Sequence, residues 1–584
     1  MTQLTRFKNF LVGHLDHLAL ISLAAMAIIP FQNAHHFNPI PSFLAEWWAA
    51  LFGLVACGFV FLRPSTWQAF PLPRILLSPL ILILALLLQF GLGKIAFVEQ
   101  ALIMAAILLW ACLMASLGQG LVRRRGLEWL ADGLSTALIA GALLEVLVMM
   151  LQASHSAYST QLIFPRRASL YGNLGQANHL NDYLWLATAS ALYLRGRGRI
   201  SLGWLTALLA ILLFASALST SRSILLYGAA LGFLGWLAAR NKPDLSSLRR
   251  NAFFLLPVAI LFLFIAREFI PLLSSENLSG GGTLERFYAE AQNSSIRLKL
   301  WRTALQSIGE APWLGHGMGS VPWQYFSHAM NWPAGEAAPV AEHVHNLPLQ
   351  LMAEFGIPLT IMVLGLACWW LRDFLRQPLT LARWWLLALL AIMGLHSLLE
   401  YPLWYTFFLG PFALLLGAGD TGQRVLANGR RGLASFIVIL ALAGSILGIL
   451  RQDFLDMERI LNWRFLGQGE MNLPASVQHL LTLQANSLLS PQATVSFALM
   501  MEPVRDHLDD RRALCHSAMA FAPTERVVFK CVVLDAMAQD PRAENNLHQA
   551  LAAFPDASPR LRQELLSQVK VSPETLHLLE ALPR

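Results

Sequence analysis

Thirteen apolar runs of about twenty residues constrain this 584-residue chain more than any other feature of its sequence. Each run is long enough to cross about 30 Å of hydrocarbon as a helix. Hydrophobic residues make up 56% of the chain and charged residues only 13%, a balance that no water-soluble domain of this size would tolerate. The sequence therefore predicts an all-α polytopic membrane protein with spans centred near Ala24, Gly53, Ile83, Leu108, Ala140, Ala187, Ala210, Ala230, Ile260, Met362, Ala391, Ala413 and Ala441.

The basic residues predict the orientation of these spans. If the amino terminus is cytoplasmic, roughly twenty Lys and Arg residues fall in cytoplasmic loops and about eight fall outside, as the positive-inside rule requires. The net charge of +7 is scattered over short loops, which favours a topological signal over a nucleic-acid-binding surface. The first run could also be the apolar part of a signal peptide, but we favour a retained helix. An odd number of spans then places the chain beyond Arg451 outside the cytoplasm.

The character of the sequence changes near residue 451, which predicts two domains. Residues 1–451 form a transmembrane domain with a large outside loop at 272–345, whereas residues 452–584 are more charged and predict a small helical domain. Similar segments around Phe521 and Phe554 recur 33 residues apart, near the length of a tetratricopeptide-like helical hairpin. An irregular helical bundle is the alternative.

Cysteine placement is consistent with this division. Cys515 and Cys531 lie in the outside domain and could pair in an oxidising compartment. The other three cysteines lie in apolar runs without metal-ligand spacing, so we interpret them as packing residues.

A dense polar run at 171–183, YGNLGQANHLNDY, stands immediately before the sixth apolar run. Polar side chains at membrane depth are costly and usually functional. Asn173, Gln176, Asn178 and His179 offer donors and acceptors suited to hydroxyl-rich or phosphate groups. The alternative is a helix-entry loop in which Asn178 is the N-cap.

Two arginines on the outside face are candidate anion ligands. Arg222 lies in a very short turn at 219–223, where a guanidinium can hold a lipid phosphate by two hydrogen bonds or simply reach the interface. Arg297 lies in a segment at 294–310 whose periodicity predicts an amphipathic helix lying on the membrane. Helical spacing places Arg297 on the apolar side, beside Trp301.

His343 and His345 lie in the segment at 342–350, which enters the next span. The HxH spacing alone is a weak zinc signal, so no metal is expected. A histidine at the membrane edge is the natural general base for a hydroxyl nucleophile. On a helix the two rings would point about 200° apart.

A last outside turn contains Glu400, Tyr401 and Tyr405. Glu400 could orient a histidine or an arginine. For both tyrosines the more common role is that of interfacial-belt residues. Either could instead contribute to a site, and the sequence does not choose between Tyr401 and Tyr405.

The runs YGNLGQANHLNDY, STSR, IRLKLWRTALQSIGEAPWLGHGMG, HVHNLPLQLMAEFGIP and LEYPLWYTFFLGPFALLLG closely resemble those of bacterial protein O-oligosaccharyltransferases, the pilin-glycosylation ligases of PglL type. This family belongs to the superfamily of O-antigen ligases and polymerases. The resemblance covers about residues 165–419 in family order. The SR and HxHN elements are shared across the superfamily, whereas GNLGQxNHL is narrower and favours the protein ligases.

The resemblance implies transfer of a preassembled oligosaccharide from undecaprenyl diphosphate to Ser or Thr hydroxyls of periplasmic proteins such as pilin. It implies a multi-pass protein of the bacterial inner membrane with a periplasmic active site, and neither cofactor nor metal. An O-antigen ligase or polymerase, which transfers glycan to lipid A core or to another glycan, is the alternative. A transporter would need polar or charged residues in mid-span or broken spans in matched halves, and the sequence has no such pairing.

By family motif, His345 matches the essential catalytic histidine and Gln176 the functional glutamine. Arg222 and Arg297 match the diphosphate-binding arginines. Ala177 stands where many members have proline, which affects local rigidity rather than chemistry. Further substrate-binding candidates are Asn173, Asn178, His179, Asn346, Tyr401 and Tyr405.

Overall fold

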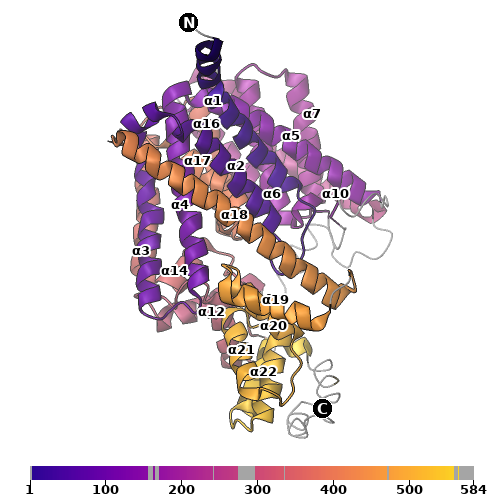
Figure 1. Ribbon diagram of the computed structural model, residues 1–584. Coiled ribbons are helices and arrows are strands. Elements are labelled where there is room, and N and C mark those ends of the chain that lie inside the picture. The colour runs from indigo at the N-terminus through magenta and orange to yellow at the C-terminus, as the bar shows by residue number, and fades with distance from the viewer. Residues whose placement is uncertain are drawn as a thin grey trace. The chain divides into compact units, whose positions relative to one another are not determined.

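The computed structural model describes residues 3–154, 162–164, 170–240, 242–273, 296–333, 336–469, 472–557 and 563. Part of the predicted outside loop, residues 274–295, lies outside these ranges. The described residues are almost entirely helical, and two short strands, β1 (Phe70–Pro71) and β2 (Val425–Leu426), pair antiparallel (Figure 1). The all-α prediction is therefore confirmed.

The described residues up to 273 form ten α-helices. They are α1 (Gln3–Ile28), α2 (Phe43–Phe61), α3 (Leu77–Gly91), α4 (Val98–Arg125), α5 (Leu127–Ala153), α6 (Ala177–Gly196), α7 (Leu202–Leu218), α8 (Ser223–Ala239), α9 (Ser246–Phe253) and α10 (Leu255–Leu273).

The remaining helices follow residue 295. They are α12 (Ile296–Glu310), α13 (Val321–Ser327), α14 (Leu347–Phe355), α15 (Ile357–Leu375), α16 (Leu381–Ser397), α17 (Thr406–Gly419), α18 (Gly429–Leu466), α19 (Leu473–Asn486), α20 (Ser490–Met500), α21 (Leu508–Phe521), α22 (Glu525–Met537) and α23 (Ala543–Ala553).

Every predicted span corresponds to a helix. Eight helical segments are long and apolar enough to cross a membrane, and α7, α8, α16 and α17 are shorter apolar helices. Together with α6 they contain all thirteen predicted span centres. The chain is thus an all-α polytopic membrane protein.

The chain folds into two compact units. Unit 1 comprises residues 1–80, 107–293 and 364–448, and unit 2 comprises residues 81–106, 294–363 and 449–584. The division predicted near residue 451 remains a prediction, because the structure groups residues 449–584 with two earlier segments.

Helix α6 forms the centre of unit 1. It contacts α5, α7, α8 and α16, and all its side chains from His179 to Leu194 are buried. Asn181 has partners on neighbouring helices: it donates to the hydroxyl of Ser223 over 2.6 Å and accepts a hydrogen bond from Ser216. Such internal satisfaction is what permits polar residues inside lipid.

The outer faces of unit 1 are apolar, as lipid contact requires. Residues Ile437, Val438, Ile439 and Leu442 on α18 are among its exposed large side chains. Near the middle of α1 the buried carboxylate of Asp16 pairs with three arginines from segments predicted to be cytoplasmic. They are Arg63, Arg124 and Arg125.

The C-terminal helices of unit 2 are regularly spaced. Helices α19, α21 and α23 begin at intervals of 35 residues, and α22 begins 35 residues after α20. Successive helices from α19 to α23 contact one another. This spacing supports helical-hairpin repeats over an irregular bundle. The similar segments around Phe521 and Phe554 lie at the C-terminal ends of α21 and α23. Because these two helices differ in length, the segments recur after 33 residues although the helices begin 35 residues apart.

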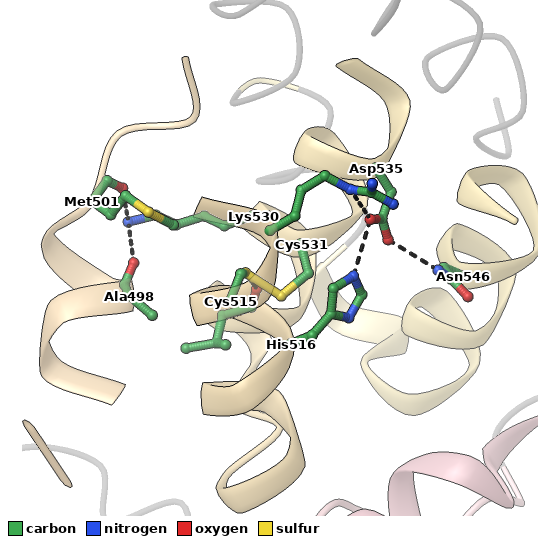
Figure 2. Close-up of a disulfide and its surroundings, with 10 residues drawn as sticks. Ala498, Met501, Cys515, His516, Lys530, Cys531, Asp535 and Asn546 are labelled. Carbon is green, nitrogen blue, oxygen red and sulfur yellow. Dashed lines mark hydrogen bonds and ion pairs between the residues drawn. A yellow bond between two sulfur atoms is a disulfide. The ribbon is translucent and has the colours of Figure 1, made fainter. Parts of the chain in front are cut away.

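Two sets of contacts connect helices α20 to α23. A disulfide joins Cys515 on α21 to Cys531 on α22, and the adjacent Lys530 donates to the carbonyl oxygens of Ala498 and Met501 at the end of α20 (Figure 2). The cysteine pairing suggested by the sequence is therefore present in the structure.

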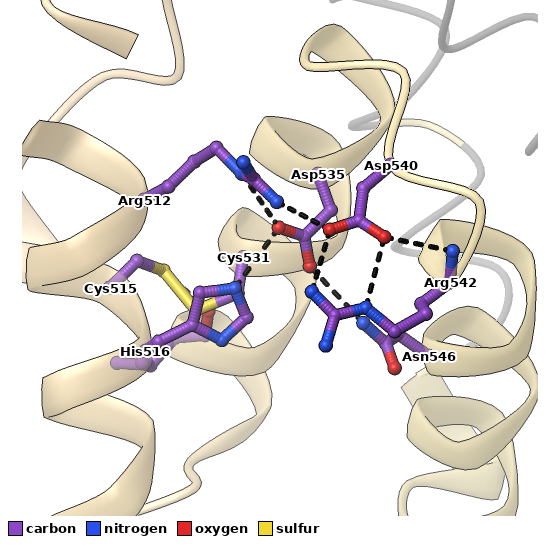
Figure 3. A network of polar contacts seen from close by, with 9 residues as sticks. Arg512, Cys515, His516, Cys531, Asp535, Asp540, Arg542 and Asn546 are labelled. Atoms are coloured by element: carbon purple, nitrogen blue, oxygen red, sulfur yellow. Dashed lines mark hydrogen bonds and ion pairs between the residues drawn. A yellow bond between two sulfur atoms is a disulfide. The ribbon is translucent and has the colours of Figure 1, made fainter. Parts of the chain in front are cut away.

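The second set centres on Asp535 of α22. Its carboxylate accepts hydrogen bonds from Arg512 and His516 of α21 and from Asn546 of α23, at 3.0 to 3.1 Å (Figure 3). These bonds connect three consecutive helices. Burial alone would raise the pKa of Asp535, but the hydrogen bonds and charges of His516 and Arg512 hold it below its usual range.

Candidate functional site

The polar run before α6 folds into a turn whose backbone is hydrogen-bonded to side chains of α5. Gln152 accepts a hydrogen bond from the Gly172 N–H and donates to its carbonyl oxygen, at 3.1 and 2.9 Å. Glu145 accepts from the Asn173 N–H at 2.9 Å. Gly172 and Gly175 adopt positive φ angles of 62° and 70°, which glycine tolerates at low cost. Side chains of α5 thus hold the backbone of this turn.

The side chain of Asn173 is hydrogen-bonded within this turn and does not project from it. The residue is 3% exposed. Its side-chain amide donates to the carbonyl oxygens of Gln32 and Leu162, at 3.1 and 3.0 Å, and accepts from the Phe164 N–H. Both ends of the amide are therefore engaged by backbone, which assigns Asn173 a structural role within the predicted site.

Glu400 links this turn to the turn at 400–405 in the same unit. Its carboxylate, in a residue only 3% exposed, accepts hydrogen bonds from Asn178 at 2.6 Å and from Gln176 at 3.5 Å. A carboxylate only accepts, so both amide NH2 groups face Glu400. The oxygen of Gln176 is thereby oriented away from Glu400 as a fixed acceptor.

The turn containing Arg222 is joined to the same network. The oxygen of Asn178 accepts a hydrogen bond from Ser221 at 2.7 Å, and the next residue, Arg222, is the N-cap position of α8. A helix N-terminus favours an anion, and so does a guanidinium. The structure therefore brings together in unit 1 three predicted runs, at 171–183, 219–223 and 400–405.

Aromatic residues cover His179 within this unit. The ring of His179, 3% exposed, meets Tyr405 edge-to-face at 5.2 Å between centroids and Tyr401 at 6.2 Å. His396 on α16 lies 5.4 Å from the same ring. Both candidate tyrosines thus contact the predicted site.

The N-cap position of α6 is Gln176, not Asn178, so the N-cap alternative for Asn178 is wrong.

In unit 2 the HVHN segment forms an irregular turn that ends at α14. His343 and His345 precede the helix, so the helical geometry assumed for them is wrong. His345 has φ +57°, a left-handed conformation that is uncommon for a residue other than glycine and costs free energy. Such strain is concentrated at functional sites.

The neighbours of His345 on both sides are anchored. The Val344 side chain is fully buried and its N–H donates to Gln350 at 2.7 Å. Asn346 is the N-cap of α14, accepting from the Leu349 N–H at 3.1 Å. The side-chain oxygen of Asn346 therefore serves the helix, a use the sequence analysis did not predict.

The environment of His343 makes it a poor general base. Burial, with the neighbouring His345, lowers the pKa of His343 to about 3. Such an imidazole is a weak proton acceptor at neutral pH. The low pKa of His343 therefore argues against His343 as the general base.

Arg297 lies in the first turn of α12, in the same unit. The buried face of this helix, formed by Leu300, Ala304 and Ile308, packs in one apolar cluster with Val344. That face is covered by α13 and α14, which corrects the expectation that α12 lies with its apolar side on the membrane.

Arg302, on the opposite side of α12, is engaged elsewhere. It pairs with Glu336 at 3.3 Å and stacks on the ring of Trp332 at 3.7 Å. The two arginines of α12 are thus structurally distinct, and only Arg297 shares the helix side that packs with the His345 segment.

Several residues of these networks were missed by sequence reasoning. Glu145 and Gln152 lie seven residues apart on one side of α5, and Gln350 and Glu354 lie four apart on α14. Polar residues within otherwise apolar helices were the available signal.

Comparisons with known proteins match most of the chain. Residues 207–364 match the family described as O-Antigen ligase, and residues 384–567 match the family described as virulence factor membrane-bound polymerase, C-terminal. A general O-oligosaccharyltransferase of Acinetobacter baylyi is 27% identical over 430 residues, which cover 70% of this chain and 71% of that protein. A ComP-specific O-oligosaccharyltransferase of the same organism is 25% identical over 248 residues, 42% of this chain and 43% of that protein.

Proposed function

Because the chain belongs to the O-antigen ligase superfamily and is similar to its protein O-oligosaccharyltransferases, we propose that it transfers a preassembled oligosaccharide from undecaprenyl diphosphate to Ser or Thr hydroxyls of periplasmic proteins, pilin among them. The observation that carries this proposal furthest is the backbone of His345. A non-glycine residue in a left-handed conformation, anchored on both sides, is a candidate for a preorganised catalytic group.

In the proposed reaction the acceptor hydroxyl oxygen forms a bond to the anomeric carbon of the first sugar. The bond from that carbon to the phosphate oxygen breaks, and its electron pair leaves with the lipid diphosphate. His345 takes the hydroxyl proton. Arg222 and Arg297 stabilise the growing negative charge of the diphosphate by charge-assisted hydrogen bonds. Neither a metal ion nor a nucleotide sugar takes part in these steps.

The outer turns of unit 1 supply the remaining roles. Gln176, whose amide is oriented by Glu400, presents its oxygen to a sugar hydroxyl or to the acceptor. Asn178, His179, Tyr401 and Tyr405 line the same group of turns. Amides and tyrosines are suited to hydroxyl-rich ligands because they both donate and accept.

The disulfide supports a periplasmic location for the C-terminal helices. Disulfides persist in oxidising compartments and are rare in the cytoplasm. With thirteen spans and a cytoplasmic amino terminus, the positive-inside rule places Cys515 and Cys531 on the same side of the inner membrane as the outside turns.

Intact mass of an acceptor protein tests the proposal. A bacterial host that makes an undecaprenyl-diphosphate oligosaccharide is given this chain together with a pilin. The pilin should gain the mass of one whole oligosaccharide, and its digestion should place the glycan on Ser or Thr. Unmodified pilin and unmodified periplasmic proteins, despite a full pool of lipid-linked donor, would overturn the proposal.

The two family matches favour one second candidate, a ligase or polymerase that transfers glycan to lipid A core or to another glycan. The same host distinguishes it. Glycan would then appear on lipopolysaccharide or as longer polymers, and the pilin mass would stay unchanged.

A further inference from the structure

We propose that Glu354 and Gln350 are positioning residues that hold the backbone of the catalytic segment so that His345 keeps its left-handed conformation. The inference rests on the proposed function of His345 as general base. All the contacts that carry it lie within unit 2.

The first link joins Gln350 to the residue before His345. The side-chain oxygen of Gln350 accepts a hydrogen bond from the Val344 N–H at 2.7 Å, and Gln350 is 2% exposed. A buried amide N–H is costly to leave unpaired. Loss of Gln350 would therefore release the Val344 backbone from its present position.

The second link joins Glu354 to Gln350, one helical turn further along α14. The Glu354 carboxyl oxygen Oε1 accepts from the Gln350 amide at 2.9 Å, which fixes that amide with its oxygen toward Val344. The same oxygen accepts from the Gly319 N–H at 2.9 Å. Glu354, 1% exposed, thus sets the direction of the Gln350 side chain.

The glycine-rich segment at 315–319 holds Glu354 from the other side. His316 and Gly317 donate their N–H groups to the carbonyl oxygens of Ala353 and Glu354, at 2.9 and 3.0 Å. A Cβ added at Gly315 would lie 2.3 Å from the backbone of Glu354. The segment can approach α14 this closely only because it is glycine, so its role here is packing against Glu354.

These hydrogen bonds hold the residues on both sides of His345 in place. Val344 is held by Gln350, while Asn346 caps α14 and its carbonyl oxygen accepts from the Gln350 N–H at 2.9 Å. The intervening residue must turn through φ +57° to connect them. A strained conformation persists only where its surroundings over-determine it. Without the Gln350 contact, His345 would relax toward common backbone angles and its ring would move.

Four variants of the full-length protein in detergent test the inference. Glu354→Ala and Gln350→Met remove the links, and the latter keeps most of the side-chain volume. Glu354→Gln keeps an oxygen able to accept from both N–H groups. Glu310→Gln is the matched control, because it alters the buried His328 contact on α12 without touching the chain of links. The assay uses a fluorescent polyprenyl-diphosphate oligosaccharide and a serine-containing pilin.

We expect kcat to fall about ten- to a hundredfold in Glu354→Ala and Gln350→Met, with KM changed less than threefold, since orientation affects the chemical step. Glu354→Gln should restore kcat to within about threefold, and Glu310→Gln should equal the parent protein. All rates are normalised to the monodisperse fraction from gel filtration, so lost folding does not count as lost catalysis.

The outcomes separate the inference from the proposed function. Normal kcat in folded Glu354→Ala and Gln350→Met would overturn the positioning role while leaving glycan transfer intact. A Glu354→Gln variant as slow as Glu354→Ala would also overturn it. If the parent protein transfers no glycan, or His345→Ala transfers it at the parent rate, the proposed function fails instead.

Discussion

Asn178 donates its amide to the buried carboxylate of Glu400 over 2.6 Å, and its amide oxygen accepts from Ser221 over 2.7 Å. One side chain thus connects two residues that lie 222 and 43 positions away from it along the chain. Glu400 is therefore the shared hydrogen-bond acceptor of Gln176 and Asn178 in unit 1.

Replacing Glu400 should therefore impair transfer. In Glu400→Ala the amides of Gln176 and Asn178 lose a charged acceptor, a loss of about 1.5–3 kcal/mol, or about ten- to a hundredfold in rate. Initial rates of pilin modification by the purified variant measure this. Glu128→Gln is the control, because Glu128 is in an exposed ion pair with Arg197 that contributes little. A Glu400→Ala rate equal to the control would remove Glu400 from the site.

Arg222 and Arg297 should behave alike toward the lipid diphosphate. Arg222→Ala and Arg297→Ala should each lower kcat/KM for the lipid-linked donor about ten- to a hundredfold, because each removes a charge-assisted hydrogen bond. Lysine at either position should restore only part of the rate, since it lacks the bidentate fork.

Arg302→Ala is the matched control for this pair, because Arg302 lies on the opposite side of α12 against Trp332 and Glu336. It should transfer at the parent rate. Equal losses in Arg297→Ala and Arg302→Ala would assign the effect to the stability of α12 rather than to the diphosphate.

Most of the fold could be predicted from sequence, because span length and apolar composition are local properties. The centres of all predicted spans lie in helices, including α6, whose polar residues lower its hydropathy. The pairing of Asn178 with Glu400 could not be predicted, because their chain separation is large and neither residue indicates its partner.

The conformation of the HVHN segment could not be predicted from the sequence either, although its partners lie nearby in the chain. The sequence identified His345, but it assumed a helix where Asn346 caps α14 and ends the irregular turn. The left-handed backbone of His345 depends on Gln350 and Glu354, which are polar residues in a short helix with no motif of their own. Asn173 was likewise assigned to substrate although backbone groups occupy its amide.

The disulfide should stabilise the C-terminal helices and report their compartment. It closes a loop with a sequence separation of 16, so its removal should cost about 2–4 kcal/mol of unfolding free energy. Chemical denaturation of Cys515→Ser/Cys531→Ser in detergent, followed by protease resistance of residues 473–557, measures this. In intact cells neither thiol should react with a maleimide before reduction. Full labelling of both without reductant would contradict the periplasmic placement.

Glu354 should make stability depend on pH. Burial raises the pKa of Glu354 from 4.5 to about 7. Between these values the unfolded chain has lost a proton that the folded protein keeps, so stability falls as pH rises from about 4.5 to about 7 and is level above it. The full change is about 3 kcal/mol.

Comparison with Glu354→Gln isolates this contribution, since the other charged and titratable groups near residue 354 are the same in both proteins. They are His316 and Lys94 on the adjoining segments and His343 and His345 before α14. The difference in unfolding temperature between parent and variant should shift in favour of the variant as pH rises from 4.5 to 7. A difference independent of pH would contradict a protonated Glu354.

Single-turnover transfer by His345→Ala tests the central claim most directly. General base catalysis contributes about a hundred- to ten-thousandfold, so the purified variant should transfer oligosaccharide to pilin slower by that factor, while His343→Ala should be affected far less. EDTA should leave the parent rate unchanged. Transfer by folded His345→Ala at the parent rate, or loss of parent activity in EDTA that a divalent cation restores, would contradict His345 as the base.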